Sequence, residues 1–335
     1  MESYKKIIIT GAAGFLGGRV AKHFAKLFPG SLIIATSRRN KRAQEFEESG
    51  IKFIAGDLTE SGFADTLTSD SSLIIHCAAL SSPWGNYSDF YQSNFLATKS
   101  LADAAVRNRV PAFIFISTPS IYFNFRDRYN VKESDGLPVK MVNHYAATKL
   151  LAEEYVLGLN GQNIQTLALR PRAIIGAEDT VILPRVLEAY SQGKLKIVGN
   201  GKNICDLTAV RNVIEAIVCA INADKSAYGK AYNITDGDPV VLWEALNYML
   251  RQLELEPVTK KVPARLAESV AFLSELKAKL ISANKEPALT RYGIGVMAQN
   301  FTLDISSARK NLNYKPVQTT MEAIDEYIAW HNNRK

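Results

Sequence analysis

The chain has 335 residues, long enough to enclose a substantial core in one large α/β domain or in two moderate ones. Hydrophobic residues make up 47% of the sequence and charged residues 22%, which is typical of a soluble globular protein. The formal net charge is +7, which by itself would suit a protein that binds nucleic acid or a membrane surface. The positive residues are scattered rather than clustered, however, and this argues against such partners.

The cysteines and the apolar segments indicate a cytoplasmic protein. Cys77, Cys205 and Cys219 have neither metal-like nor disulfide-like spacing, and reduced cysteines suit the cytosol. The N-terminus shows no signal-peptide pattern, and no apolar stretch reaches the length of a membrane span. We therefore expect no bound metal and no transmembrane segment.

The first half of the chain alternates short apolar segments with segments of helical spacing. The apolar segments are rich in β-branched residues and do not alternate with polar ones, as expected for strands buried on both faces of a parallel sheet. The predicted strands are 7–10, 32–36, 52–55, 73–76, 113–117 and 166–169, and the predicted helices include 15–28, 87–108 and 143–159. This order predicts an α/β fold with a doubly wound parallel sheet.

Beyond residue 170, prolines and glycines separate shorter elements. We expect residues 1–170 to hold the sheet and residues 171–335 to form mainly a smaller lobe on its carboxyl edge, in one continuous structure. Residues 266–281 are apolar-rich at helical spacing. Such a helix suits the wall of an apolar pocket, peripheral contact with a membrane, or packing within its own lobe.

The first predicted strand runs into a glycine-rich turn, Gly11-Ala12-Ala13-Gly14-Phe15-Leu16-Gly17, and then into a helix. Gly11 allows the tight turn, Gly14 lets the backbone approach a pyrophosphate, and Gly17 lets the helix pack closely on the strand. The helix N-terminus adds unpaired N–H groups and the positive end of the helix dipole. The turn predicts a Rossmann-type dinucleotide site contacted by Gly11, Gly14, Phe15, Leu16 and Gly17.

The end of the second predicted strand indicates which dinucleotide binds. An acidic residue there would hydrogen-bond the ribose 2′-hydroxyl of NAD, whereas a basic residue accommodates the 2′-phosphate of NADP. Here the strand ends in Ser37-Arg38-Arg39, with no acid nearby. Ser37 and Arg38 therefore predict NADP, with NAD and a merely solvated basic turn as the alternatives.

Two further strand ends are expected to meet the cofactor. Asp57 and Leu58 follow the third strand, and Ala78 and Ala79 follow the fourth, where small side chains let the backbone lie against the cofactor. His76 ends the fourth strand without ligand partners, which favours a structural role over metal binding.

Tyr145 and Lys149 are four residues apart on a predicted helix, so the phenol and the ammonium share one face. The ammonium and a positively charged nicotinamide ring should lower the pKa of Tyr145 towards a range that suits general acid–base catalysis. The pair follows Ser117-Thr118-Pro119-Ser120 at the end of the fifth strand, which a chance pairing would not explain.

These motifs together resemble the extended short-chain dehydrogenase/reductase family over nearly the whole chain. The resemblance implies that Thr118 polarises the substrate, that Tyr145 is the general acid/base, and that Lys149 binds the nicotinamide ribose. It also implies that Asn94 and Pro171 lie at the cofactor site. Ser120 is the alternative to Thr118 as the residue that polarises the substrate. The matching segments are 10–17, 57–58, 76–79, 94, 117–122, 145–149 and 169–171.

Two substrate classes compete within this family. A nucleotide-sugar epimerase or dehydratase would carry an acidic pair where Pro119-Ser120 stands, an asparagine within the segment Arg170-Pro171-Arg172-Ala173, and an arginine in place of Cys205. Segments 82–85, 232–240 and 287–292 instead resemble the 3β-hydroxysteroid dehydrogenase and 2-alkyl-3-oxoalkanoate reductase branch, which implies an apolar substrate.

The expected reaction is reversible hydride transfer between nicotinamide and a secondary alcohol or ketone of a sterol-like or alkyl-oxoacid-like molecule. Nucleotide-sugar epimerisation or dehydration is the alternative. A dinucleotide sensor that lacks catalysis is disfavoured, because Thr118, Tyr145 and Lys149 are all intact. We also expect a homodimer through helices 87–108 and 143–159, an arrangement the family often shows.

Overall fold

The computed structural model describes residues 4–281 and 286–334. Its central sheet has seven strands, all parallel. Along the sheet they are β12 (Ala231–Ile234), β7 (Gln165–Pro171), β5 (Ala112–Ile116), β4 (Leu73–His76), β1 (Lys6–Thr10), β2 (Leu32–Ser37) and β3 (Lys52–Ala55).

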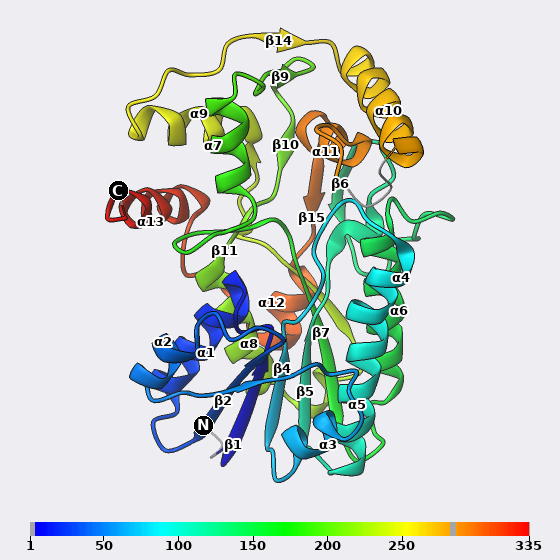
Figure 1. Cartoon of the computed structure of the whole chain (residues 1–335), viewed down its shortest axis with the longest axis vertical. Helices are drawn as coiled ribbons and strands as arrows, with labels where there is room; N and C mark the ends of the chain where they lie inside the picture. Colours follow the sequence, from blue (N-terminus) through cyan, green and yellow to red (C-terminus); the bar gives the residue numbers. More distant parts are fainter. Residues whose placement is uncertain (1–3, 282–285, 335) are drawn as a thin grey trace.

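Helices cover both faces of this sheet (Figure 1). One face carries α1 (Phe15–Leu27), α2 (Ala43–Glu48), α8 (Val210–Ile221) and α12 (Ser306–Leu312), and the other carries α3 (Phe63–Thr68), α4 (Tyr87–Phe90), α5 (Ala97–Arg107) and α6 (His144–Gly158). Within β1, Ile7 and Ile9 pack into the first layer and Ile8 into the second, and all three are fully buried. The doubly wound α/β fold is therefore confirmed.

Two elements differ from the predicted pattern. The predicted helix 87–108 is a continuous run in which a π-helix, η1 (Tyr91–Leu96), joins α4 to α5. The seventh strand, β12, and its neighbour α8 come from beyond residue 170, yet they pack with the sheet formed by residues 1–170. The sheet therefore draws on both halves of the chain.

The rest of the second half forms a lobe above the carboxyl ends of the sheet strands (Figure 1). Its helices are α7 (Leu183–Ser191), α9 (Leu242–Gln252), α10 (Ala264–Ile281), α11 (Arg291–Ala298) and α13 (Thr320–Asn332). Its short strands are β8 (Ile174–Ile175), β9 (Ile197–Val198), β10 (Ile204–Cys205), β11 (Thr208–Ala209), β13 (Val240–Val241), β14 (Lys261–Val262) and β15 (Phe301–Leu303). The first half of the chain adds β6 (Arg128–Val131), which pairs with β15. The 3₁₀ turns η2 (Pro119–Tyr122) and η3 (Lys225–Ala227) complete the described elements.

Helix α10 lies at the outer edge of this lobe. Ala267 and Ala271 are buried against the lobe, whereas Leu273, Leu280 and Ile281 are more than 60% exposed. Across the described residues, no helix combines the length and the apolar character that crossing a bilayer requires.

Candidate active site

The glycine-rich turn forms a cradle that fits a dinucleotide phosphate. Gly11 has a φ of +67°, and a Cβ added there would lie 2.7 Å from the backbone of Ala78. A Cβ at Gly17 would lie 2.5 Å from the carbonyl oxygen of Gly11. Helix α1 begins after Gly14 with no side-chain cap and no acid in its first turn, so its N–H groups are available to an anion. Both close contacts exclude any larger residue, which matches the roles predicted for these glycines.

The end of β2 brings Arg38 to the same cavity. Arg38 lines the cavity beside Ser37, Asp57 and Leu58. Burial raises the pKa of Asp57, but hydrogen bonds from Thr59 and the charge of Arg38 outweigh it, so the net shift is downward. Among the described residues Arg38 makes no ion pair, whereas Arg42 of the same basic run is paired with Glu45 and Glu178 at 2.6 Å. Arg38 is the basic side chain of this run that lines the cavity, and no ion pair within the described residues occupies it.

Tyr145 stands at the centre of a group of hydroxyl side chains. Its half-buried phenol is hydrogen-bonded to the side chains of Thr118 and Ser81. The Thr118 hydroxyl donates to Ser120 Oγ at 3.1 Å, and Ser120 Oγ lies 2.9 Å from the hydroxyl of Tyr292 on α11. A substrate oxygen placed here would meet several donors in a site screened from water, as a proton-transfer reaction requires.

Lys149 is buried one turn beyond Tyr145 and lines the same cavity. Its ammonium donates to the carbonyl oxygen of Ile116 at 2.6 Å and lies 3.9 Å from the centroid of the Phe115 ring. Burial is the main influence on this group and lowers the pKa of Lys149 to about 7, against an opposing effect of Glu153. The lysine is therefore held in place by the strand end rather than by the tyrosine.

The expectation that Lys149 lowers the pKa of Tyr145 is wrong for this structure. Burial raises the pKa of Tyr145 above its ordinary value, the hydrogen bonds from Thr118 and Ser81 oppose that rise, and Lys149 is not among its causes. The reason is geometric: spacing along a helix sets which face a side chain occupies, but the ammonium is directed to Ile116.

Lys149→Met should stabilise the protein in a pH-dependent way. The pKa of Lys149 is about 10.4 in the unfolded chain and about 7 in the folded protein, so between these pH values the unfolded state binds more protons than the folded state. The stability of the wild type therefore falls as the pH falls through this range, and the loss is complete below about pH 7. We expect the melting temperature of Lys149→Met to exceed that of the wild type most at about pH 6, and the gain to shrink towards about pH 10. Replacing the exposed Lys41 by Met is the control. A gain of equal size at every pH would contradict this assignment.

Nearly all the residues predicted to contact the cofactor lie together. The cavity wall contains every one of them except Asn94, namely Gly11, Gly14, Phe15, Leu16, Gly17, Ser37, Arg38, Asp57, Leu58, Ala78, Ala79, Tyr145, Lys149 and Pro171. Asn94 is fully buried in η1, where its amide bonds both backbone groups of Leu80 and the hydroxyl of Thr148. Its donors and acceptor are occupied, so it holds the Leu80 loop against α6 instead of facing a cofactor.

His76 has the structural role that the sequence favoured. Its two ring nitrogens lie 2.6 Å from Thr10 Oγ1 and 2.8 Å from Thr98 Oγ1, and burial lowers the pKa of the imidazole to about 3. The neutral ring thus ties β4 to β1 and α5. Within the described ranges, no cluster of three or more His, Cys, Asp or Glu side chains could hold a metal ion.

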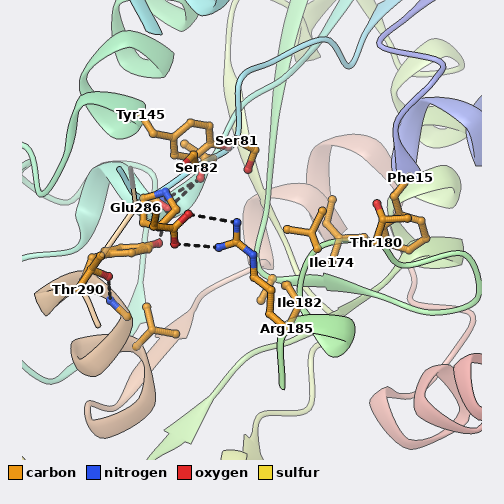
Figure 2. Close-up of a pocket in the computed structure, with 18 of the residues that line it drawn as sticks. Phe15, Ser81, Ser82, Tyr145, Ile174, Thr180, Ile182, Arg185, Glu286 and Thr290 are labelled. Atoms are coloured by element: carbon orange, nitrogen blue, oxygen red, sulfur yellow. Dashed lines mark hydrogen bonds and ion pairs between the residues drawn. The ribbon is translucent and has the colours of Figure 1, made fainter. Parts of the chain in front are cut away.

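The cavity widens from the glycine turn into the second lobe and has a volume of about 1640 Å³. The lobe contributes mainly apolar side chains to it, including Ile174, Ile182, Leu207, Leu246, Val270 and Met297. Figure 2 shows Tyr145 and Ser81 at one side of this pocket and Ile174 and Ile182 at the other, with Arg185 between them. Arg185 on α7 pairs with Glu286 at 3.3 Å and so links two sides of the wall.

Two members of the hydroxyl group, Ser81 and Tyr292, were not predicted as site residues. Tyr292 lies within a segment that the sequence had marked by resemblance, whereas Ser81 lies between two such segments, 76–79 and 82–85, and neither residue has a local pattern that indicates a role. Tyr292 reaches Ser120 from a helix that is distant in the sequence. Ser81 comes to Tyr145 from the loop after β4, whereas the packing of the second lobe on the sheet brings Tyr292 to this group.

The parallel sheet, the glycine cradle and the Tyr145 group define a nicotinamide-dinucleotide-dependent oxidoreductase of the Rossmann type. The family model of the NAD dependent epimerase/dehydratase family matches residues 7–235. The chain belongs to this family, a group of extended short-chain dehydrogenases/reductases, which confirms the resemblance seen in the sequence.

Curated relatives and a solved structure extend this result. A 2-alkyl-3-oxoalkanoate reductase of Shewanella oneidensis is 28% identical, over 96% of this chain and 85% of the relative. A decarboxylating sterol-4-alpha-carboxylate 3-dehydrogenase of Mus musculus is 29% identical, over 99% of this chain and 92% of the relative. A UDP-glucuronic acid 4-epimerase of Bacillus cereus, solved with NAD, shares the fold with a TM-score of 0.76 at 20% identity, over 98% of this chain and 99% of that one.

Proposed function

We propose that this enzyme transfers a hydride between nicotinamide and a secondary alcohol or ketone carried by a largely apolar molecule. The observation that carries the proposal is the position of Tyr145: its hydroxyl, bonded to Thr118 and Ser81, lines the cavity that the glycine cradle shares with the apolar side chains of the second lobe. A substrate held there presents its oxygen to Tyr145 and its apolar body to the second lobe.

Each polar residue has one task in this reaction. In the reductive direction Thr118 donates a hydrogen bond to the carbonyl oxygen, and Tyr145 gives that oxygen a proton as the carbon is reduced; oxidation reverses both. Lys149, fixed by Ile116, would hold the nicotinamide ribose and help to resupply the proton. When bound, the nicotinamide supplies or accepts the hydride.

The cavity lining favours an apolar substrate over a nucleotide sugar. Pro119 and Cys205 are both buried, and neither offers a charge to a sugar or a diphosphate. Turnover measured with 3-oxosteroids, 2-alkyl-3-oxoacids and nucleotide sugars, each with NADPH and NADH, tests the proposal. Activity confined to nucleotide sugars would replace it with the epimerase or dehydratase alternative.

We further propose NADP as the cofactor, and Arg38→Ala tests this choice. Arg38 should bind the 2′-phosphate of NADPH, and charge-assisted hydrogen bonds contribute about 1.5–3 kcal/mol. The mutant should therefore bind NADPH about 10- to 100-fold more weakly and NADH almost unchanged, as measured by fluorescence titration. Arg39→Ala is the matched control, because Arg39 does not line the cavity. An equal loss for both cofactors, or a wild type that prefers NADH, would remove the basis for NADP.

The predicted homodimer and the cytoplasmic location both stay proposals. Helices α5 and α6, which contain most of the proposed interface, lie side by side on one face of the sheet (Figure 1). Their outer surface carries a cluster of Lys99, Asp103 and Tyr155 side chains, joined by hydrogen bonds.

A further inference from the structure

Arg172 places a cation in the wall of the apolar cavity. It follows directly after β7, where its backbone N–H donates to Ile234 at 3.1 Å and its carbonyl oxygen accepts from the Thr208 hydroxyl. The guanidinium lies over the ring of Phe301, 4.8 Å from its centroid, and the residue is only 5% exposed. Backbone hydrogen bonds and the contact with the Phe301 ring therefore fix the position of Arg172.

One donor of this guanidinium is not satisfied by the protein. Its Nε is buried without a hydrogen-bond partner, and Arg172 forms no ion pair with any residue that the structure describes. Arg170, two residues earlier, shows the usual arrangement, because Glu153 and Tyr122 bond its guanidinium. A buried cation without a partner costs folding free energy, and such groups are rare in native proteins.

The nearest acid is already committed to other groups. Asp206 accepts a hydrogen bond from the backbone of Leu303 at 2.6 Å and another from the Thr235 side chain. Arg172 acts on Asp206 through its charge but does not pair with it, and burial raises the pKa of Asp206 to about 6. Because Asp206 does not pair with the guanidinium and Arg172 Nε has no hydrogen-bond partner, an anion from outside the protein would complete the site.

The guanidinium and the catalytic hydroxyls share one cavity. Thr118, two residues past the end of β5, and Pro171, the last residue of β7, occupy equivalent places on neighbouring strands, because Ile116 of β5 pairs with Leu169 of β7. Arg172 is the next residue after Pro171. Contacts between aromatic rings also connect the two groups: Phe301 packs on Phe123 at 5.8 Å, and Phe123 packs on Tyr292 at 5.4 Å. One small molecule can therefore bind both groups.

We propose that Arg172 binds the carboxylate of the substrate, which is a hydroxy or oxo carboxylic acid with a large apolar group. This inference rests on the proposed hydride transfer, since it places the reacting oxygen at Tyr145. A planar guanidinium matches a carboxylate in a two-bond arrangement. A single cation among Leu207, Cys205 and Phe301 suits one carboxylate better than a diphosphate. Each of the two curated relatives is named for a substrate that carries a carboxylate near the reacting carbon.

The test compares an acid with its ester. Binding of 3-hydroxydecanoate and of methyl 3-hydroxydecanoate to the cofactor-loaded protein is measured by calorimetry, for the wild type and for Arg172→Gln. We expect the variant to lose about 10- to 100-fold in affinity for the acid and little for the ester. Arg185→Gln is the matched control, because it also removes a cation from the cavity wall, one already paired with Glu286.

Several outcomes would overturn the assignment. The first is that Arg172→Gln binds the acid as tightly as the wild type does, and the second is that Arg185→Gln alone abolishes the preference for the acid. UDP-glucose binding that depends on Arg172 while acid binding does not would assign the residue to a diphosphate. Should Arg172→Gln fail to fold, Arg172→Lys keeps the charge and should weaken acid binding selectively. If Arg172→Lys loses the same affinity for the acid as for the ester, the proposal is likewise overturned.

Turnover of the same two compounds tests the proposed function separately. If the wild type binds the acid through Arg172 but oxidises neither compound, the proposed hydride transfer is contradicted and the role of Arg172 is not. A wild type that oxidises both compounds equally, with no change in Arg172→Gln, supports hydride transfer and overturns the role of Arg172.

Discussion

Tyr145→Phe should lower turnover by about 10²–10⁴-fold, the usual contribution of general acid–base catalysis. The change removes one hydroxyl and keeps the ring, so folding and cofactor affinity should survive. Thr118 then loses its bond to the phenol but keeps its contact with Ser120, so the loss of rate reports the missing proton donor rather than a collapsed site. Steady-state rates with an accepted substrate, together with cofactor titration by fluorescence, give the two measurements.

Two neighbouring variants separate the roles within the site. Thr118→Ala should reduce turnover and spare cofactor affinity, because its hydroxyl faces the substrate. Lys149→Ala should weaken cofactor binding as well as turnover, because the lysine would contact the nicotinamide ribose. A Tyr145→Phe enzyme with near-normal turnover would show that the proton passes through another group, and the mechanism proposed here would be wrong.

Glu153→Ala should reduce the free energy of unfolding by about 3–5 kcal/mol, because it leaves the guanidinium of Arg170 buried and uncompensated. Glu153 is 2% exposed and Arg170 is 8% exposed at their side chains, and Arg170 Nε donates to the carboxylate at 2.8 Å. Chemical denaturation measures the change. Because Glu153 also raises the pKa of Lys149, the same variant should lower that pKa further.

The double variant Glu153→Leu, Arg170→Met distinguishes charge from packing. It removes both charges and keeps apolar volume, so it should be more stable than Glu153→Ala. Exposed pairs give the comparison: Asp65→Ala, which breaks the surface pair with Arg107, should cost less than about 1 kcal/mol. If Glu153→Ala costs no more than Asp65→Ala, the buried pair does not stabilise the fold in the way described.

The local sequence determined the strands, the cofactor turn and the Tyr145 helix. Their signals are short-range: buried parallel strands are continuously apolar, and a tight turn against a phosphate needs glycine at positions such as Gly11 and Gly17. The spacing of Tyr145 and Lys149 likewise places both on one helix face. For these reasons β1 to β5 lie within a residue or two of their predicted limits.

Tertiary packing decided the rest, because it joins groups that no local pattern connects. Strand β12 enters the sheet from the second half of the chain, and Tyr292 reaches Ser120 across 172 positions. Packing also decides which groups interact: Lys149 bonds Ile116, Asn94 holds a loop, and Arg172 Nε is buried without a hydrogen-bond partner. A pKa or an unsatisfied donor depends on which atoms surround a group in space, and those atoms come from strands and helices far apart in the sequence.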